Sequence, residues 1–67
     1  MRGLSNDKQL EVYSLYKQAI LGDCDIPRPG MFDLKAKAKW DAWDGRKGMS
    51  QKKAEKAYVK LIDELLG

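Results

Sequence analysis

The sequence predicts an all-α protein made of three helices. Two long segments, 8–21 and 51–66, contain neither glycine nor proline and carry apolar residues at helical spacing. A capping residue precedes each predicted helix, and glycine or proline interrupts the chain between them. No segment shows the regular alternation of polar and apolar residues that is typical of a strand. At 67 residues the chain is expected to form one domain, 1–67, near the lower size limit for an independent hydrophobic core.

The first helix is expected from Lys8 to Leu21. Ser5-Asn6-Asp7 supplies side chains that can cap its start, and Gly22 is a natural stop. Steps of about 100° per residue divide its apolar and aromatic residues between two opposite faces. One face holds Leu10, Tyr13, Lys17 and Ile20, and the other holds Val12, Leu15, Tyr16 and Ala19. Both faces therefore need something to contact.

A loop and a second helix are expected next. The segment from Asp23 to Phe32 contains two prolines and a glycine, which a helix interior does not tolerate. Asp33 then caps a helix that runs from about Leu34 to Trp43 and fades before the next two glycines.

The third helix is capped by Ser50 and continues to the C-terminus. Its apolar residues cover an arc of roughly 200°, whereas a surface helix needs a stripe of only about 100° facing a core. We therefore expect this helix to pack against more than one neighbour. The residues of the arc are Ala54, Ala57, Tyr58, Val59, Leu61, Ile62, Leu65 and Leu66.

Composition excludes several classes of protein. With 43% hydrophobic and 34% charged residues, the chain has enough apolar material to fold. It has no histidine and a single cysteine, Cys24, so we expect neither an intrachain disulfide, nor a Cys/His zinc site, nor an enzyme of the usual nucleophile and base kind. Met1 to Leu4 lead directly into polar residues, and no apolar run suits a leader or a membrane span. A cytoplasmic protein is the expectation.

Aromatic rings interleaved with lysines are the feature most relevant to binding. Tyr13 and Lys17 share a helix face four residues apart, and Lys35 and Lys39 repeat that spacing on the second helix. With a net charge of +3, two such helices side by side could hold a phosphate ester against a tyrosine ring. The same lysines could equally be solvated surface, and the tyrosines and both tryptophans could be packing residues. Composition and spacing alone leave the function open.

The order of these motifs resembles the acyl-CoA-binding protein (diazepam-binding inhibitor) family, from about Leu10 to Leu65. The resemblance rests on five segments: Tyr13 to Ala19, Gly22-Asp23, Arg28 to Met31, Lys35 to Trp43, and Ala57-Tyr58. It implies an up-down helical bundle that holds a long-chain acyl-CoA as its ligand, with no cofactor and no chemistry on the thioester.

The resemblance also implies roles for individual residues. Tyr13 would contact the adenine, while Tyr16, Lys17 and Lys39 would hold the 3′-phosphate of the ribose. Lys35 matches another position that faces the head group, and Tyr58 would lie along the acyl region. Trp40 and Trp43 match positions that also serve packing, and Trp43 is expected to be mainly structural.

The chain departs from this family at its start, where the family's first helix is expected before Ser5-Asn6-Asp7. The sequence thus predicts three of the usual four helices, in a domain that is N-terminally truncated relative to the family. The wide apolar arc of the last helix would then lie open, and we favour its being covered by a second copy of the chain. The alternative function is an oligomerising helical interaction module with weakened or lost acyl-CoA binding. A nucleic-acid binder is disfavoured because the lysines of the second helix alternate with alanines and acids.

Overall fold

The computed structural model describes residues 5–67, and the expectation for Met1 to Leu4 lies outside the described residues. These residues form three helices: α1 is Asn6–Leu21, α2 is Leu34–Asp44 and α3 is Gln51–Leu66. The described residues contain no strand, so the predicted all-α class is confirmed. None of the described helices is long and apolar enough to cross a lipid bilayer.

Each helix begins directly after a capping residue that the sequence predicts, although α1 starts at Asn6, two residues before the expected Lys8. The hydroxyl oxygen of Ser5 accepts a hydrogen bond from the backbone N–H of Lys8, and that of Ser50 accepts one from Lys53. The carboxylate of Asp33 does the same for the N–H of Ala36 at 3.1 Å. Such caps satisfy backbone donors that the first helical turn leaves unpaired, which is why short local signals fix the helix starts.

The predicted ends of the helices are also confirmed. Gly22 ends α1 with a φ of 83°, a left-handed conformation that glycine adopts without a steric penalty. The second helix ends at Asp44, one residue beyond the expected Trp43 and before the first of the two following glycines.

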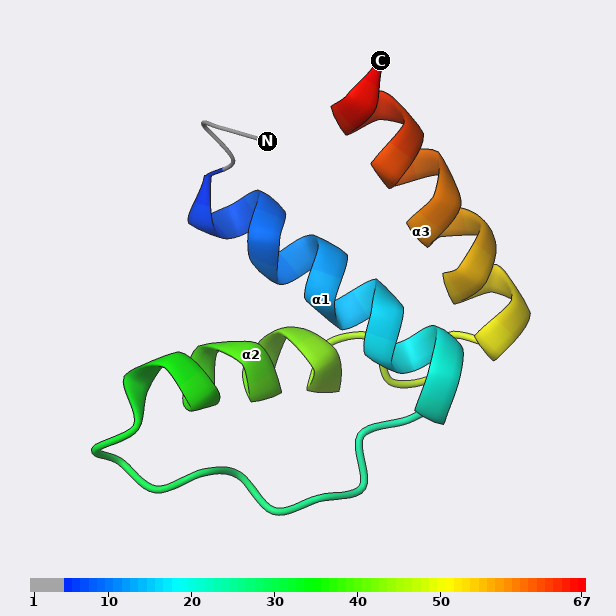
Figure 1. The fold of residues 1–67 in the computed structure, drawn as a ribbon. Helices are drawn as coiled ribbons and strands as arrows, with labels where there is room; N and C mark the ends of the chain where they lie inside the picture. Colours follow the sequence, from blue (N-terminus) through cyan, green and yellow to red (C-terminus); the bar gives the residue numbers. More distant parts are fainter. Residues whose placement is uncertain (1–4) are drawn as a thin grey trace.

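The other two helices are arranged around α1. The loop from residue 22 to residue 33 carries the chain back along the molecule, so that α2 runs in roughly the same direction as α1, while α3 returns in the opposite direction (Figure 1). Both α2 and α3 pack against α1, whereas α2 and α3 have no Cα atoms within 8 Å of each other. The prediction that both faces of the first helix need a partner is therefore confirmed.

The core is small and lies mainly between α1 and α3. Its buried apolar side chains are Leu15, Cys24, Trp43, Ala54 and Leu61. Within residues 5–67, α3 packs against α1 alone, so the second neighbour expected from its wide apolar arc is not among the described elements. Val59 and Leu66 on that arc are exposed.

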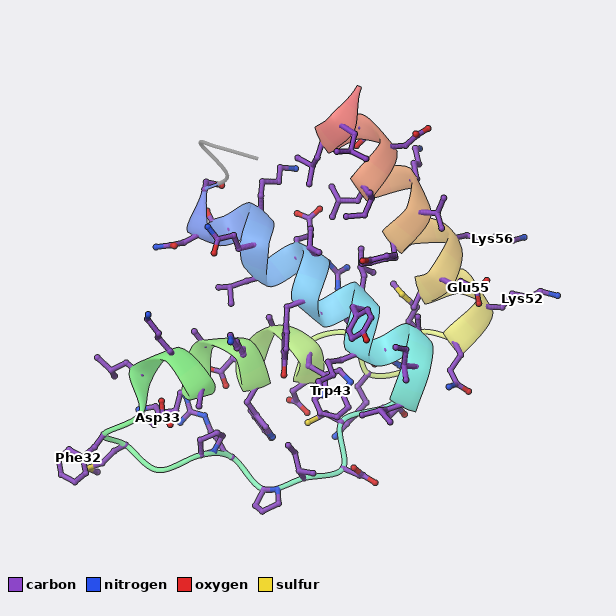
Figure 2. All side chains as sticks on the ribbon, viewed as in Figure 1. Phe32, Asp33, Trp43, Lys52, Glu55 and Lys56 are labelled. Atoms are coloured by element: carbon purple, nitrogen blue, oxygen red, sulfur yellow. The ribbon has the colours of Figure 1, made fainter. Side chains whose placement is uncertain are left out.

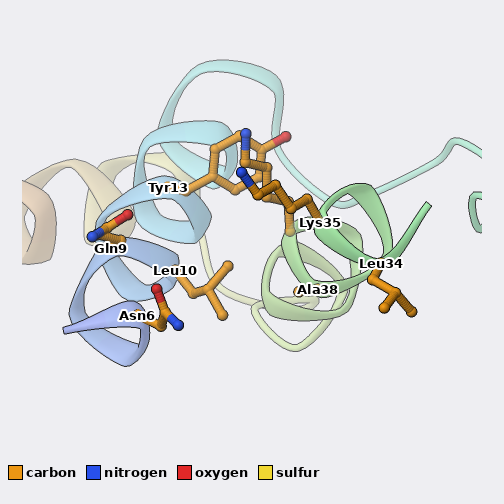
Figure 3. Close-up of a pocket in the computed structure, with 8 residues that line it drawn as sticks. Asn6, Gln9, Leu10, Tyr13, Leu34, Lys35 and Ala38 are labelled. Carbon is orange, nitrogen blue, oxygen red and sulfur yellow. The ribbon is translucent and has the colours of Figure 1, made fainter.

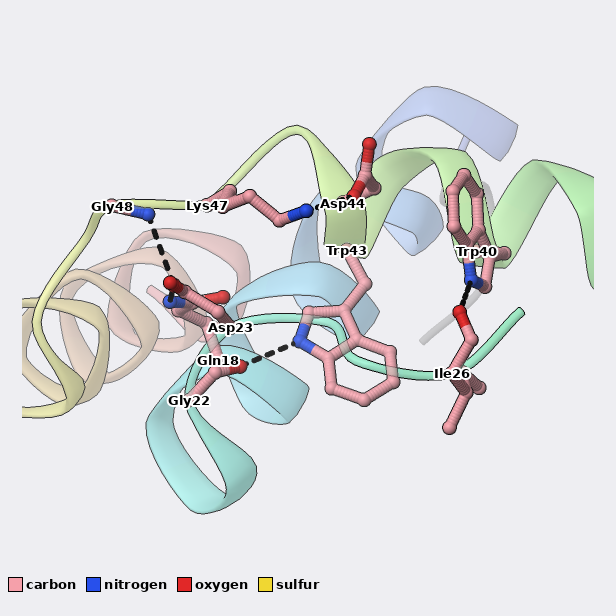
Figure 4. A network of polar contacts seen from close by, with 9 residues as sticks. All are labelled: Gln18, Gly22, Asp23, Ile26, Trp40, Trp43, Asp44, Lys47 and Gly48. Carbon is pink, nitrogen blue, oxygen red and sulfur yellow. Dashed lines mark hydrogen bonds and ion pairs between the residues drawn. The ribbon is translucent and has the colours of Figure 1, made fainter. Parts of the chain in front are cut away.

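A polar network joins α1 to the two connections that follow α1 and α2 (Figure 4). The amide nitrogen of Gln18 donates to a carboxylate oxygen of Asp23 at 2.8 Å and to the carbonyl oxygen of Met49 at 2.7 Å. The same Asp23 oxygen accepts from the backbone N–H of Gly48 at 3.0 Å. These bonds fix how the chain leaves α1 and how it enters α3.

The long loop is held against α2 by side chains of that helix. The indole N–H of Trp43 donates to the carbonyl oxygen of Gly22, and that of Trp40 donates to the carbonyl oxygen of Ile26 (Figure 4). Farther along, the guanidinium of Arg28 makes two parallel 3.0 Å bonds to the carboxylate of Asp41. The loop thus has three separate anchors, which keep α2 in place beside α1.

Candidate functional site

A pocket opens between α1 and α2 (Figure 3). It has a volume of about 480 Å³, within the range of small-molecule sites. Its eight lining residues combine apolar side chains with two lysines and include no carboxylate. Those residues are Asn6, Gln9, Leu10, Tyr13, Leu34, Lys35, Ala38 and Lys39. The pocket therefore suits a ligand that is partly apolar and partly anionic.

Helical spacing explains how the two walls form. Leu10 and Tyr13 are three residues apart on α1, and Lys35 and Lys39 are four residues apart on α2, so each pair shares a face. Because α2 packs against α1 and runs in a roughly similar direction (Figure 1), the two faces line opposite sides of the pocket. Ala38 on the α2 side is small, which leaves room between the helices.

Two lysines from different helices converge on the ring of Tyr13. The ammonium of Lys17 lies 5.9 Å from the ring centroid, and that of Lys39 lies 5.5 Å from it. The Lys17 ammonium also lies 5.5 Å from the ring of Trp43. Aromatic faces attract cations, so the rings of Tyr13 and Trp43 keep the two ammonium groups close to Tyr13. An anion bound there could be contacted from α1 and α2 together.

The other two predicted tyrosines lie between α1 and α3. The rings of Tyr16 and Tyr58 have their centroids 5.9 Å apart and are tilted by 50°, a favourable geometry for an aromatic pair. Neither ring lines the pocket between α1 and α2. The structure therefore brings Tyr13, Lys17 and Lys39 together and places Lys35 in the pocket wall, while the Tyr16–Tyr58 pair occupies the neighbouring face of α1.

The two tryptophans have mainly structural positions. Trp43 is buried, and its N–H is bonded to a loop carbonyl, in agreement with its predicted packing role. Trp40 is half-buried and bonded to the loop in the same way. Through its contact with Lys17, the ring of Trp43 also supports a residue of the candidate site.

The carboxylates near the site are engaged elsewhere. The hydrogen bonds from Arg28 hold the pKa of Asp41 below its usual value, and the same contact raises the pKa of the guanidinium. Bonds from the backbone N–H of Gly48 and the amide of Gln18 lower the pKa of Asp23. These carboxylates stay ionised at neutral pH, and their partners neutralise or hold them, which leaves the lysines of the pocket free to attract an anion.

Sequence reasoning missed part of the pocket wall. Asn6, Leu34 and Ala38 line it, but none of them carries chemistry that singles out a site. Leu10 could have been found, because it shares a predicted helix face with Tyr13. The residues described contain no cluster of histidine, cysteine or acidic side chains that could hold a metal ion.

Comparisons with known proteins give a consistent result. The family described as "Acyl CoA binding protein" matches residues 1–62. Acyl-CoA-binding protein homolog 1 of Caenorhabditis elegans is 55% identical over 62 residues, which are 92% of this chain and 72% of that protein. The Acyl-CoA-binding protein of Saccharomyces cerevisiae is 52% identical over 92% of this chain and 71% of its own length. The crystal structure of Oryza sativa Acyl-CoA-Binding Protein 2 superposes with a TM-score of 0.95 at 41% identity, covering 98% of this chain and 73% of that one.

Proposed function

Because the chain belongs to the acyl-CoA-binding protein family, we propose that it binds long-chain fatty acyl-CoA esters reversibly, as a carrier and pool former inside the cell. The observation that carries this proposal is the pocket between α1 and α2, where apolar walls lie beside converging lysines. An acyl-CoA is an apolar chain joined to a phosphate-rich head group, so it needs both kinds of surface.

We assign the head group to Tyr13 and the residues around it. The Tyr13 ring offers a flat surface for the adenine, and Lys17 and Lys39 are both within 6 Å of its centroid. These two lysines would hold the 3′-phosphate together with the hydroxyl of Tyr16. Lys35, on the same face of α2 as Lys39, would contact another part of the head group.

The acyl chain is expected to supply much of the affinity. Each methylene taken out of water contributes about 0.8 kcal/mol, so this contribution grows with the length of chain that is buried. Leu10, Leu34 and Ala38 offer apolar surface in the pocket, and Tyr58 would lie along the acyl region. The lysines would select an acyl-CoA over a free fatty acid, which lacks the nucleotide phosphates.

Calorimetric titration tests this assignment directly. We expect the protein to bind a long-chain acyl-CoA much more tightly than CoA alone. Lys17→Ala and Lys39→Ala should each weaken acyl-CoA binding by about ten- to hundredfold, the value of a charge-assisted hydrogen bond. Lys56→Ala is the matched control, because Lys56 is exposed on α3 away from the pocket (Figure 2). Unchanged affinity in both site variants would show that the head group binds elsewhere.

We also propose that the protein works in the cytoplasm and performs no chemistry on the thioester. Cys24 is a free and buried thiol, which fits a reducing compartment. We expect no turnover of acyl-CoA to free CoA, because the sequence has no histidine and its single cysteine is buried, and chromatography of an incubated complex would reveal any hydrolysis.

A second candidate function is a self-associating helical module with little ligand affinity. It is favoured by the exposed apolar stripe of α3, where Val59 and Leu66 are seven residues apart on one face with Ile62 between them. We propose that a second copy covers this stripe. Sedimentation at tens of micromolar should then detect a dimer that Val59→Lys disrupts, whereas a stable folded monomer at that concentration would rule the association out.

A further inference from the structure

Three apolar side chains lie where the loop between α1 and α2 ends and α2 begins. Met31, Phe32 and Leu34 are 70%, 94% and 72% exposed. Phe32 lies at the far end of the loop and points away from the helices (Figure 2). Single exposed apolar residues are normal on a protein surface, but three within four consecutive residues form a patch that requires an explanation. We call these three residues the apolar tip.

The backbone holds the apolar tip outward in a defined turn. The N–H of Asp33 donates to the carbonyl oxygen of Gly30 at 3.1 Å, which closes a turn with Met31 and Phe32 at its two central positions. Asp33 also caps α2, so the turn continues directly into a helix. The side chains of Met31 and Phe32 at the centre of this turn therefore do not reach the core, and their exposure follows from the hydrogen-bonded turn.

Positive charge lies beside the apolar tip. The first turns of α2 carry Lys35, Lys37 and Lys39. Of the nearby carboxylates, Asp41 is paired with Arg28, and Asp44 is paired with Lys47 at 3.3 Å. Asp41 also interacts electrostatically with Lys37, and Asp33 caps the helix, so nearby carboxylates offset the three lysines only in part. The end of the molecule that exposes apolar side chains is therefore also positively charged.

We propose that the apolar tip inserts into the head-group region of anionic membranes and makes the protein bind them peripherally and reversibly. Apolar side chains that partition into the interface, next to lysines that attract anionic lipids, are the combination that such a surface recognises. A partner protein would be expected to offer a shaped groove, whereas a convex tip two or three residues wide suits a deformable surface. The anchor is small, so the binding is weak and transient.

Docking through the apolar tip would place the ligand pocket at the membrane. Leu34 belongs to both the tip and the pocket wall, and Lys35 follows it in that wall. An acyl ester leaving the bilayer would then enter the pocket without crossing much water. This consequence rests on the proposed function, whereas membrane adsorption itself does not.

Vesicle flotation with the full chain tests the proposal. The protein should float with vesicles of phosphatidylcholine and phosphatidylserine, and less with vesicles of phosphatidylcholine alone. Phe32→Ser should weaken binding to the anionic vesicles by about tenfold, because it removes the largest apolar side chain of the tip. Leu21→Ser is the matched control, since Leu21 is also exposed but is the last residue of α1, and this end of α1 lies on the far side of the molecule from the apolar tip (Figure 1). This control should float as the parent protein does.

A depth measurement shows whether the tip itself enters the lipid. Phe32→Trp should be quenched by brominated lipids well beyond the background of the two native tryptophans, and Leu21→Trp should not. Failure of the parent protein to float with anionic vesicles, equal floating of the Phe32→Ser variant, or equal quenching in the two tryptophan variants would each overturn the proposal. Calorimetry without vesicles separates it from the proposed function: Phe32→Ser should keep the parent's affinity for acyl-CoA, since Phe32 does not line the pocket.

Discussion

Replacing Gln18 by alanine should strongly destabilise the fold, although Gln18 lies outside the pocket. Its side chain is 0% exposed, and its amide makes two bonds shorter than 2.9 Å that tie α1 to Asp23 and to Met49. The bond to the carbonyl is worth about 1 kcal/mol, and the bond to Asp23 adds to it, although water screens this exposed carboxylate. Loss of the buried volume adds a cavity cost. We expect a total loss of about 3–4 kcal/mol.

Urea denaturation followed by circular dichroism measures this loss. A 67-residue domain has only a few kcal/mol of stability, so the Gln18→Ala midpoint should fall to a small fraction of the parent value. Gln18→Met should cost less, because it keeps most of the volume and removes the amide oxygen, which is buried without a hydrogen-bond partner in the described structure.

The matched control is Gln51→Ala. Gln51 also donates from its amide to two carbonyl oxygens, those of Ala19 and Ile20, at 3.3 and 3.0 Å. It is exposed, so water replaces its bonds and the expected cost is below about 1 kcal/mol. Equal losses in the Gln18 and Gln51 variants would refute the reasoning, because they would show that burial adds nothing to the Gln18 bonds.

Two further predictions concern the loss of stability at acidic pH and the backbone conformation of Gly48. The pKa values of Asp23 and Asp41 are lowered in the folded protein. The contribution of these carboxylates to stability is therefore complete above the ordinary Asp pKa of about 3.9, and it is lost as the pH falls through the lower folded values. Urea midpoints measured from pH 6 to pH 2 should decline below about pH 4, and Asp41→Asn should make this decline smaller. Gly48→Ala should lower the free energy of unfolding by about 1 kcal/mol, because residue 48 has a φ of 94° although no atom lies within 4 Å of the added methyl group. Gly30→Ala is its control, with open space and no positive φ, and it should be neutral or slightly stabilising by urea denaturation.

The parts of the fold that could be predicted are those with local causes. Ser5, Asp33 and Ser50 mark the helix starts because a cap needs only a side-chain oxygen three residues before a free N–H. Spacing allowed lysines of the first two helices to face one anion, and the family resemblance singled out Lys17 and Lys39. The two lysines are 22 positions apart in the sequence, and they meet because the loop brings α2 back alongside α1.

The apolar half of the pocket and the apolar tip could not be predicted for a different reason. Leu34, for example, reads as an ordinary apolar residue at a helix start, and only the packing of α2 shows that it is exposed and borders a pocket. The Gly30–Asp33 turn lies in a segment that the sequence marks as a loop, and a loop prediction does not say which side chains point outward. Side-chain direction in such segments depends on the turn type and on the anchors that hold the loop.

The position of α1 between two helices that do not touch each other connects folding with binding. Because α2 packs against α1 alone, its place depends on that one interface and on the loop anchors from Trp40, Trp43 and Arg28. A head group held by Lys17 of α1 and Lys39 of α2 would add a bond across the same interface. A ligand that binds only the folded chain stabilises it by about 2.7 kcal/mol at a hundred times its dissociation constant, a large fraction of what so small a domain possesses. If the proposed site is right, acyl-CoA would also act as a structural element, since it would fill and fasten the interface on which the position of α2 depends.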